Sequence, residues 1–141
     1  GFGAPVKQEL PPVAPGLLFW PIAWSPDGGL VAGSAVAAGR VGDIHVWSIA
    51  DRAYRRMPWS RSGQIDYSQE FLDRDHLVYA VGGDLWLGDV RGGEPRRLYG
   101  SAPGHSVTNI SAARAGRSLT WIDNADESDI WLMTLDEKTT P

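Results

Sequence analysis

Three stretches with one shared pattern decide how this chain folds: Asp43-Ile-His-Val-Trp-Ser-Ile49, Asp84-Leu-Trp-Leu-Gly-Asp-Val90 and Asp129-Ile-Trp-Leu-Met-Thr-Leu135. Each begins with Asp and continues with aliphatic residues at alternate positions, which is the pattern of a β-strand with one buried face. The first two stretches lie 41 residues apart, and the same offset places Arg55-Arg56-Met57 on Arg96-Arg97-Leu98. A repeat of this length is typical of a structural unit that is stacked several times.

Each repeat is expected to hold four short strands. In the first repeat these are predicted over Ile22–Ser25, Leu30–Ala35, Asp43–Ile49 and Tyr54–Trp59, with Asp27-Gly28 as a tight turn. Four antiparallel strands in about 40 residues are the signature of a β-propeller blade. A sandwich or a barrel also uses short alternating strands, but neither requires a repeat with matched landmarks. The sequence therefore predicts an all-β propeller, with blades at 21–60, 61–100 and 101–141 after a connector at 1–20.

The first blade carries a family resemblance. Ala23-Trp-Ser-Pro-Asp-Gly28 before an aliphatic strand, then the Asp-led strand and a closing Arg-Arg-Leu or Arg-Arg-Met, resembles the TolB-like propeller repeat, a relative of the WD repeat. The resemblance covers about residues 21–136, and its turn motif is eroded at 72–75 and 113–116. It implies six blades, of which this chain would form half. It also implies a bacterial protein, and weakly favours an extracytoplasmic location.

One strand is missing at one end of the chain and spare at the other. In the first two blades an apolar residue of the outer strand follows the motif Asp by 14 residues, which for Asp129 calls for position 143, beyond Pro141. The same spacing identifies an extra outer strand ahead of the first blade, at Val6, Lys7, Gln8, Glu9 and Leu10. Because an open sheet edge is a template for further pairing, we expect this strand, or a longer propeller, to complete the third blade. A two-fold homodimer forming a six-bladed ring is the leading assembly.

Composition excludes several functional classes. The net charge is −4, and no apolar run approaches the length of about 20 residues that spans a bilayer, so neither nucleic acid binding nor membrane insertion is expected. The chain has no Cys and only three His, and it lacks a Gly-x-Ser-x-Gly elbow, so a nucleophilic triad has no visible frame. The acidic run 123–129 lacks the ligand pattern of a calcium loop and reads as a solvated turn. No metal or cofactor is expected.

Candidate binding residues lie on the loops that should gather at one propeller face. These are the links after the outer strands, at 59–63 and 100–106, and the turns between the second and third strands, at 37–42 and 123–128. The candidates are Arg40, Trp59, Arg61, His105 and Asp126. The pairs Arg55-Arg56 and Arg96-Arg97 are interpreted as solvated edge residues, and Trp59 has an alternative interpretation as a packing residue.

The leading functional hypothesis is a non-catalytic scaffold that binds a protein or peptide through one face, as part of a larger assembly or a multidomain protein. An enzyme, or an enzyme-accessory domain associated with lyase or peptidase activity, would use the central channel, and it would need His and carboxylates clustered at the channel mouth. A purely structural or engineered half-propeller is the third possibility. The motif itself specifies a fold and not an activity.

Overall fold

The computed structural model describes all residues except 1–8, 61–64, 114–117, 126–127 and 135–141, and this part of the chain contains strands and no helix. The strands are β1 (Leu18–Trp24), β2 (Leu30–Ala37), β3 (Arg40–Ser48), β4 (Ala53–Arg56), β5 (Ile65–Phe71), β6 (His76–Val81), β7 (Asp84–Asp89), β8 (Arg96–Tyr99), β9 (Ser106–Ala112), β10 (Ser118–Asn124) and β11 (Ser128–Thr134).

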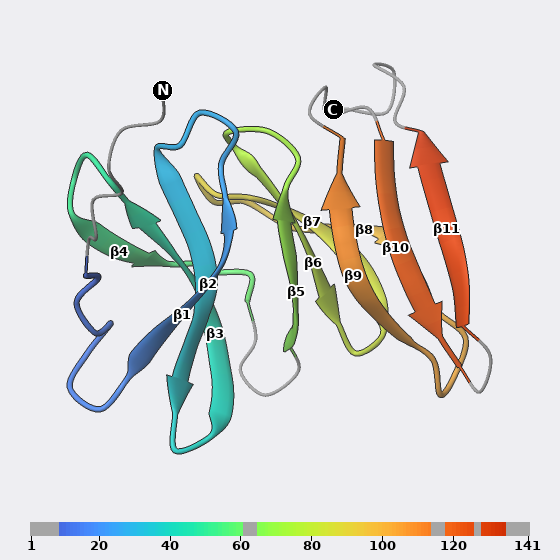
Figure 1. Ribbon diagram of the computed structural model, residues 1–141, viewed down its shortest axis with the longest axis horizontal. Helices are drawn as coiled ribbons and strands as arrows, with labels where there is room; N and C mark the ends of the chain where they lie inside the picture. Colours follow the sequence, from blue (N-terminus) through green and yellow to red (C-terminus); the bar gives the residue numbers. More distant parts are fainter. Residues whose placement is uncertain (1–8, 61–64, 114–117, 126–127, 135–141) are drawn as a thin grey trace, which may run out of the picture.

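These strands form three antiparallel sheets that stand side by side along the long axis of the molecule (Figure 1). The first has the order β1-β2-β3-β4, the second β5-β6-β7-β8 and the third β11-β10-β9; we call them blades 1, 2 and 3. The first strands of successive blades contact each other, β1 with β5 and β5 with β9. The expected all-β propeller architecture is confirmed.

Alternation along the third strand of each blade builds the core between blades. In β3, Ile44 and Val46 are buried in a cluster that also contains Leu77 and Tyr79 of β6. In β7, Leu85 and Leu87 are buried in a second cluster, which includes Leu119 of β10. Because successive side chains of a strand point to opposite faces, each blade offers one set of residues to the preceding blade and another to the next.

An indole fixes the junction between blades 1 and 2. Trp59 follows β4, lies 8% exposed, and stacks on Tyr79 with ring centroids 4.6 Å apart. Its ring N–H donates to the Asp89 carbonyl oxygen at 3.0 Å. A Cβ on Gly88 would come within 2.4 Å of this ring, so only glycine leaves room for it. Trp59 therefore lies where its alternative interpretation as a packing residue places it, buried between blades 1 and 2 and not exposed on a loop.

Polar contacts also cross between the blades. The Gln69 side-chain amide of β5 donates to the Ser34 hydroxyl of β2 at 2.8 Å, and both residues are buried. The Asn109 backbone N–H of β9 donates to the Ser68 hydroxyl of β5 at 3.0 Å. Buried polar groups are costly to leave unpaired, so the bond between Gln69 and Ser34 favours one alignment of blades 1 and 2.

The predicted turn chemistry appears between β1 and β2. Asp27 accepts hydrogen bonds from the Ser25 hydroxyl at 2.7 Å and from the Gly29 N–H at 3.0 Å. Gly28 has a φ of 72°, a left-handed conformation that glycine adopts without strain. This turn fixes the register in which Trp24 lies opposite Val31.

Candidate functional site

Two of the loops predicted to share a face, 37–42 and 100–106, lie at one end of the blades together with the β6–β7 turn. The β2–β3 turn, the β6–β7 turn and the β8–β9 link are all at the lower edge of Figure 1. Arg40 begins β3 there and is exposed, directly after Ala38 and Gly39 in left-handed conformations. Arg61 and Asp126 lie outside the described residues. We call this end the loop face.

His105 is held at the loop face by a buried carboxylate. Its Nδ1 lies 3.0 Å from Oδ1 of Asp123, and the Tyr99 hydroxyl donates to the other oxygen of the same carboxylate. Asp123 is 5% exposed, whereas the His105 side chain is 34% exposed. A carboxylate that holds one imidazole nitrogen fixes the ring and leaves the other nitrogen for an external partner.

Sequence reasoning missed Asp123 because the acidic run was interpreted as a solvated turn. That interpretation is wrong for its first two residues, since β10 runs to Asn124 and Asp123 lies opposite Val107 of β9. A signal was present: Asp123 has the same alternation as Leu119 and Trp121, which are 0% and 3% exposed. Continuing the period of two by one more step would have placed Asp123 on the buried face.

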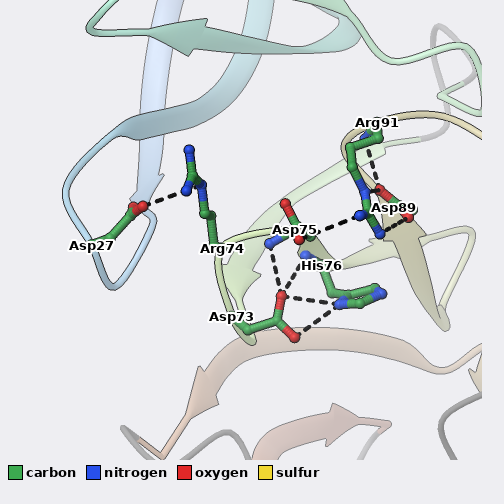
Figure 2. A network of polar contacts seen from close by, with 7 residues as sticks. All are labelled: Asp27, Asp73, Arg74, Asp75, His76, Asp89 and Arg91. Atoms are coloured by element: carbon green, nitrogen blue, oxygen red, sulfur yellow. Dashed lines mark hydrogen bonds and ion pairs between the residues drawn. The ribbon is translucent and has the colours of Figure 1, made fainter.

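A second polar network lies at the opposite end of the blades, on the turns that join first to second and third to fourth strands (Figure 2). Arg74 pairs with Asp27 of blade 1 at 3.3 Å, and Arg91 pairs with Asp75 at 3.6 Å and Asp89 at 2.8 Å. The members are Asp27, Asp73, Arg74, Asp75, His76, Asp89 and Arg91. The network joins the turns of blades 1 and 2 at the surface.

Carboxylates in this network are kept ionised by their neighbours. Hydrogen bonds from the Ser25 hydroxyl and the Gly29 N–H lower the pKa of Asp27 below its ordinary value. The Arg91 side chain lowers the pKa of Asp89 in the same way. A cavity of about 600 Å³ adjoins the network, with Arg55, Arg74 and Arg91 among its lining residues and Leu30, Val46 and Val90 as its apolar part. None of these arginines was singled out as a binding residue by the sequence.

The arginine pairs are more than solvated edge residues. Arg56 of β4 pairs with Asp43 of β3, and Nη2 of Arg97 in β8 lies 2.9 Å from Oδ2 of Asp84 in β7. The carboxylate side chains are 13% and 23% exposed, and the arginines 58% and 52%. The second Arg of each pair thus closes an ion pair with the Asp that opens the repeat motif, so the edge interpretation was incomplete.

The face of blade 3 turned away from blade 2 exposes large apolar residues. Ile130 and Leu132 of β11 are 80% and 69% exposed. Counted from the motif Asp of each blade, they are equivalent to Leu85 and Leu87 of β7, which are 0% and 9% exposed. Sequence alone placed these residues in the same strand pattern but gave no reason to separate them from their buried equivalents.

The chain segment expected to form a spare strand is described only in part. Val6, Lys7 and Gln8 lie outside the described residues, and Glu9 and Leu10 are not in a strand. The next residue, Pro11, accepts a hydrogen bond at its carbonyl oxygen from the Tyr54 hydroxyl at 2.7 Å. Pro11 therefore lies close to the outer strand of blade 1.

The described residues contain no group of three or more His, Asp or Glu side chains placed to hold a metal ion. They also contain no helix long and apolar enough to cross a membrane.

Two four-stranded antiparallel sheets and one of three described strands, stacked through their faces with their first strands adjacent, define a β-propeller segment. Two of the solved structures that it resembles are TolB structures. A protein of Agrobacterium tumefaciens assigned as TolB aligns with a TM-score of 0.70 and 15% identity, over 86% of this chain and 47% of that one. TolB of Acinetobacter baumannii aligns with a TM-score of 0.64 and 19% identity, over 86% of this chain and 31% of that one.

A protein of Clostridium novyi NT assigned as a conserved lipoprotein aligns with a TM-score of 0.61 and 13% identity, over 80% of this chain and 84% of that one. The chain thus has the TolB-like propeller fold, and it spans less than half the length of the two TolB structures. No protein-family model matches the sequence. No curated protein matches it either.

Proposed function

We propose that this chain is a non-catalytic propeller scaffold for protein interaction, and that the open face of blade 3 binds a further blade. The observation that carries the proposal is the exposure of Ile130 and Leu132, at 80% and 69%, where the equivalent Leu85 and Leu87 are buried. Burying one such side chain is worth about 1.5–3 kcal/mol, so a covering blade would gain substantially at this face. Exposed apolar patches on soluble proteins commonly mark interaction sites.

The assembly we propose is a six-bladed ring. Two copies of the chain would supply six blades in a two-fold homodimer, and the remaining blades of a longer propeller on another polypeptide would serve equally. A bacterial, extracytoplasmic setting is supported by the likeness to TolB structures and to a protein assigned as a lipoprotein. The protein or peptide ligand would then bind at the loop face, where Arg40 and His105 are exposed in full or in part.

Light scattering coupled to size exclusion tests the homodimer with three proteins. The unmodified chain should form a particle of twice its mass of 15.3 kDa. Ile130→Asp with Leu132→Asp should dissociate it, because two carboxylates would be desolvated in the interface. Arg52→Asp is the control, because it also adds a carboxylate but at an exposed residue of the turn between β3 and β4. An unmodified chain that stays monomeric at every concentration would refute the homodimer.

The same variants test the broader proposal. A fragment carrying the remaining blades should bind the unmodified chain and fail to bind the double aspartate variant. If neither a second copy nor such a fragment covers blade 3, the scaffold proposal is wrong.

A catalytic role has one supporting observation, the Asp123 carboxylate that orients His105. An imidazole oriented by a carboxylate can act as a general base, but catalysis also needs a nucleophile or water within reach of the other imidazole nitrogen. Assays with ester and peptide substrates should therefore give no turnover. Reproducible turnover that His105→Ala abolishes would reverse this ranking.

A further inference from the structure

A cavity of about 460 Å³ lies in the junction of blades 1 and 2. This volume is within the range of about 300–1,000 Å³ that is usual for binding pockets. Its lining includes aromatic rings, prolines and one carboxylate, and the members that matter here are Pro58, Tyr79, Val81, Asp84 and Trp86. Gly82 of the β6–β7 turn also lines it, so one end of the cavity lies at the loop face.

An aromatic ring occupies the corresponding place in the junction of blades 2 and 3. The ring centroid of Tyr99 lies 5.2 Å from that of Trp121 and 6.2 Å from that of Trp131. The Tyr99 hydroxyl donates to the buried Asp123 carboxylate. A tyrosine that follows the outer strand of blade 2 therefore packs on the aromatic residues of blade 3 and is held at its polar end by a carboxylate.

The neighbours of Tyr99 have counterparts that line the cavity. The strand register gives these counterparts as Tyr79 for Trp121, Trp86 for Trp131 and Val81 for Asp123. By the 41-residue offset, the place of Tyr99 itself is taken by Pro58, which also lines the cavity. The cavity is therefore the space that a tyrosine ring fills at the next junction.

Asp84 offers a hydrogen-bond acceptor at the loop-face end of the cavity. It lies opposite Val81 in the strand register, one strand away from the place that Asp123 has in blade 3. Its Oδ1 accepts from the Ser101 N–H at 3.1 Å, and its Oδ2 lies 2.9 Å from Nη2 of Arg97. A carboxylate has about four acceptor sites, so these two contacts leave capacity for a further donor.

We propose that this cavity binds a tyrosine side chain of a protein partner, with the ring against Tyr79 and Trp86 and the hydroxyl donating to Asp84. The proposal rests on the proposed function, because it names the residue by which the scaffold would recognise its partner. Tyrosine supplies a large, rigid contact area at a low cost in conformational entropy. Aromatic anchors that enter pockets carry much of the binding energy of protein interfaces.

The test measures binding of the capped pentapeptide Gly-Gly-Tyr-Gly-Gly to the full ¹⁵N-labelled chain by NMR, with Phe or Ala versions of the peptide for comparison. Saturable shifts are expected at the Trp86 indole N–H and the Gly82 backbone N–H. The Tyr peptide should bind about fivefold more tightly than the Phe peptide, because it makes one more hydrogen bond. The Ala peptide should cause no saturable shift.

Three variants locate the binding site. Pro58→Tyr should fill the cavity from within the chain, abolish binding of the Tyr peptide and raise the melting temperature. Pro103→Tyr is the matched control, because Pro103 is an exposed proline of the β8–β9 link, outside the described lining of the cavity, and this variant should bind as the unmodified chain does. Asp84→Ala should give the Tyr and Phe peptides equal affinity, and it provides a test that does not depend on the folding of Pro58→Tyr.

The outcomes separate this proposal from the one on blade 3. The double variant Ile130→Asp with Leu132→Asp should bind the Tyr peptide as the unmodified chain does, whatever its mass in light scattering. No saturable shift with the Tyr peptide, or shifts that persist in Pro58→Tyr, would overturn the tyrosine site. Equal affinity of the unmodified chain for the Tyr and Phe peptides would overturn the role of Asp84.

Discussion

The outward faces of blades 1 and 3 contain similar residues but differ in how they are covered. On blade 1, Trp47 and Val31 are 4% and 0% exposed, although they point away from blade 2. On blade 3, Ile130 and Leu132 are 80% and 69% exposed. The difference shows that these residues of β2 and β3 are covered within the chain, whereas Ile130 and Leu132 of β11 are not; three residues of β1, namely Leu18, Trp20 and Trp24, are also exposed.

Aromatic rings and an N-terminal contact close the face of blade 1. Tyr54 lies 4.6 Å from the ring of Trp47 and 4.9 Å from that of Phe19, and its hydroxyl donates to Pro11. Phe19 reaches over β2 because Gly33 has no side chain; a Cβ there would come within 2.8 Å of the ring.

The largest expected effect comes from making the same substitution at two equivalent positions of the repeat, Ile44 and Ile130. Ile44→Ala should lower the free energy of unfolding by about 2–5 kcal/mol, because Ile44 is fully buried between blades 1 and 2 and its loss leaves a cavity. Ile130→Ala should change the free energy of unfolding of the single chain by less than about 0.5 kcal/mol, because exposed positions contribute little. Urea unfolding followed by circular dichroism measures both. Equal losses would mean that the face of blade 3 is covered in solution.

A smaller effect is expected when the contact between Tyr54 and the N-terminal segment is weakened. Tyr54→Phe keeps the ring contacts and removes the hydrogen bond to the Pro11 carbonyl oxygen. The loss should be about 0.5–1.5 kcal/mol in the free energy of unfolding. Deleting residues 1–12 from the Tyr54→Phe variant should then cost less than deleting them from the unmodified chain. Additive losses would show that the hydroxyl and the N-terminal segment act independently.

The smallest effect concerns the junction of blades 2 and 3 and depends on pH. Burial raises the pKa of Glu70 above its ordinary value of 4.5, and Glu70 lies opposite Val78, a core residue of that junction. A raised pKa in the folded state means that its stabilising contribution is present below the ordinary pKa and is lost as pH rises through the folded value. Glu70→Gln should therefore raise the melting temperature near pH 7, with a gain that disappears near about pH 4.

Asp27 and Asp89 act in the opposite direction, which provides an internal control. Their lowered pKa values add stability above the ordinary carboxyl range, and that stability is lost as pH falls. Asp27→Asn should thus weaken the protein near neutral pH and have no effect in acid. A Glu70→Gln gain that persists unchanged in acid would assign it to packing and not to ionisation.

The sequence predicted the blades well because their cause is local and periodic. Alternating residues after Asp43 and Asp84, and the Asp27-Gly28 turn, act over a few residues and leave a clear pattern. The burial of Asp123 was missed because its partners, Tyr99 and His105, are contributed by another blade and the link that follows it. Likewise, the exposure of Ile130 depends on which blade lies next to it, and the strand pattern is the same in either case.

Trp59 and Gly88 have a consequence for how freely blades can be exchanged by duplication or recombination. By the 41-residue offset, the position of Trp59 is taken in the next repeat by Gly100, and the position of Gly88 is taken in β3 by Trp47. The Trp59 indole and the space that Gly88 leaves for it are therefore a matched pair that occurs at one junction of the described chain. A shuffled order of blades would set an indole against a side chain, or leave a void, so these modules are homologous without being interchangeable.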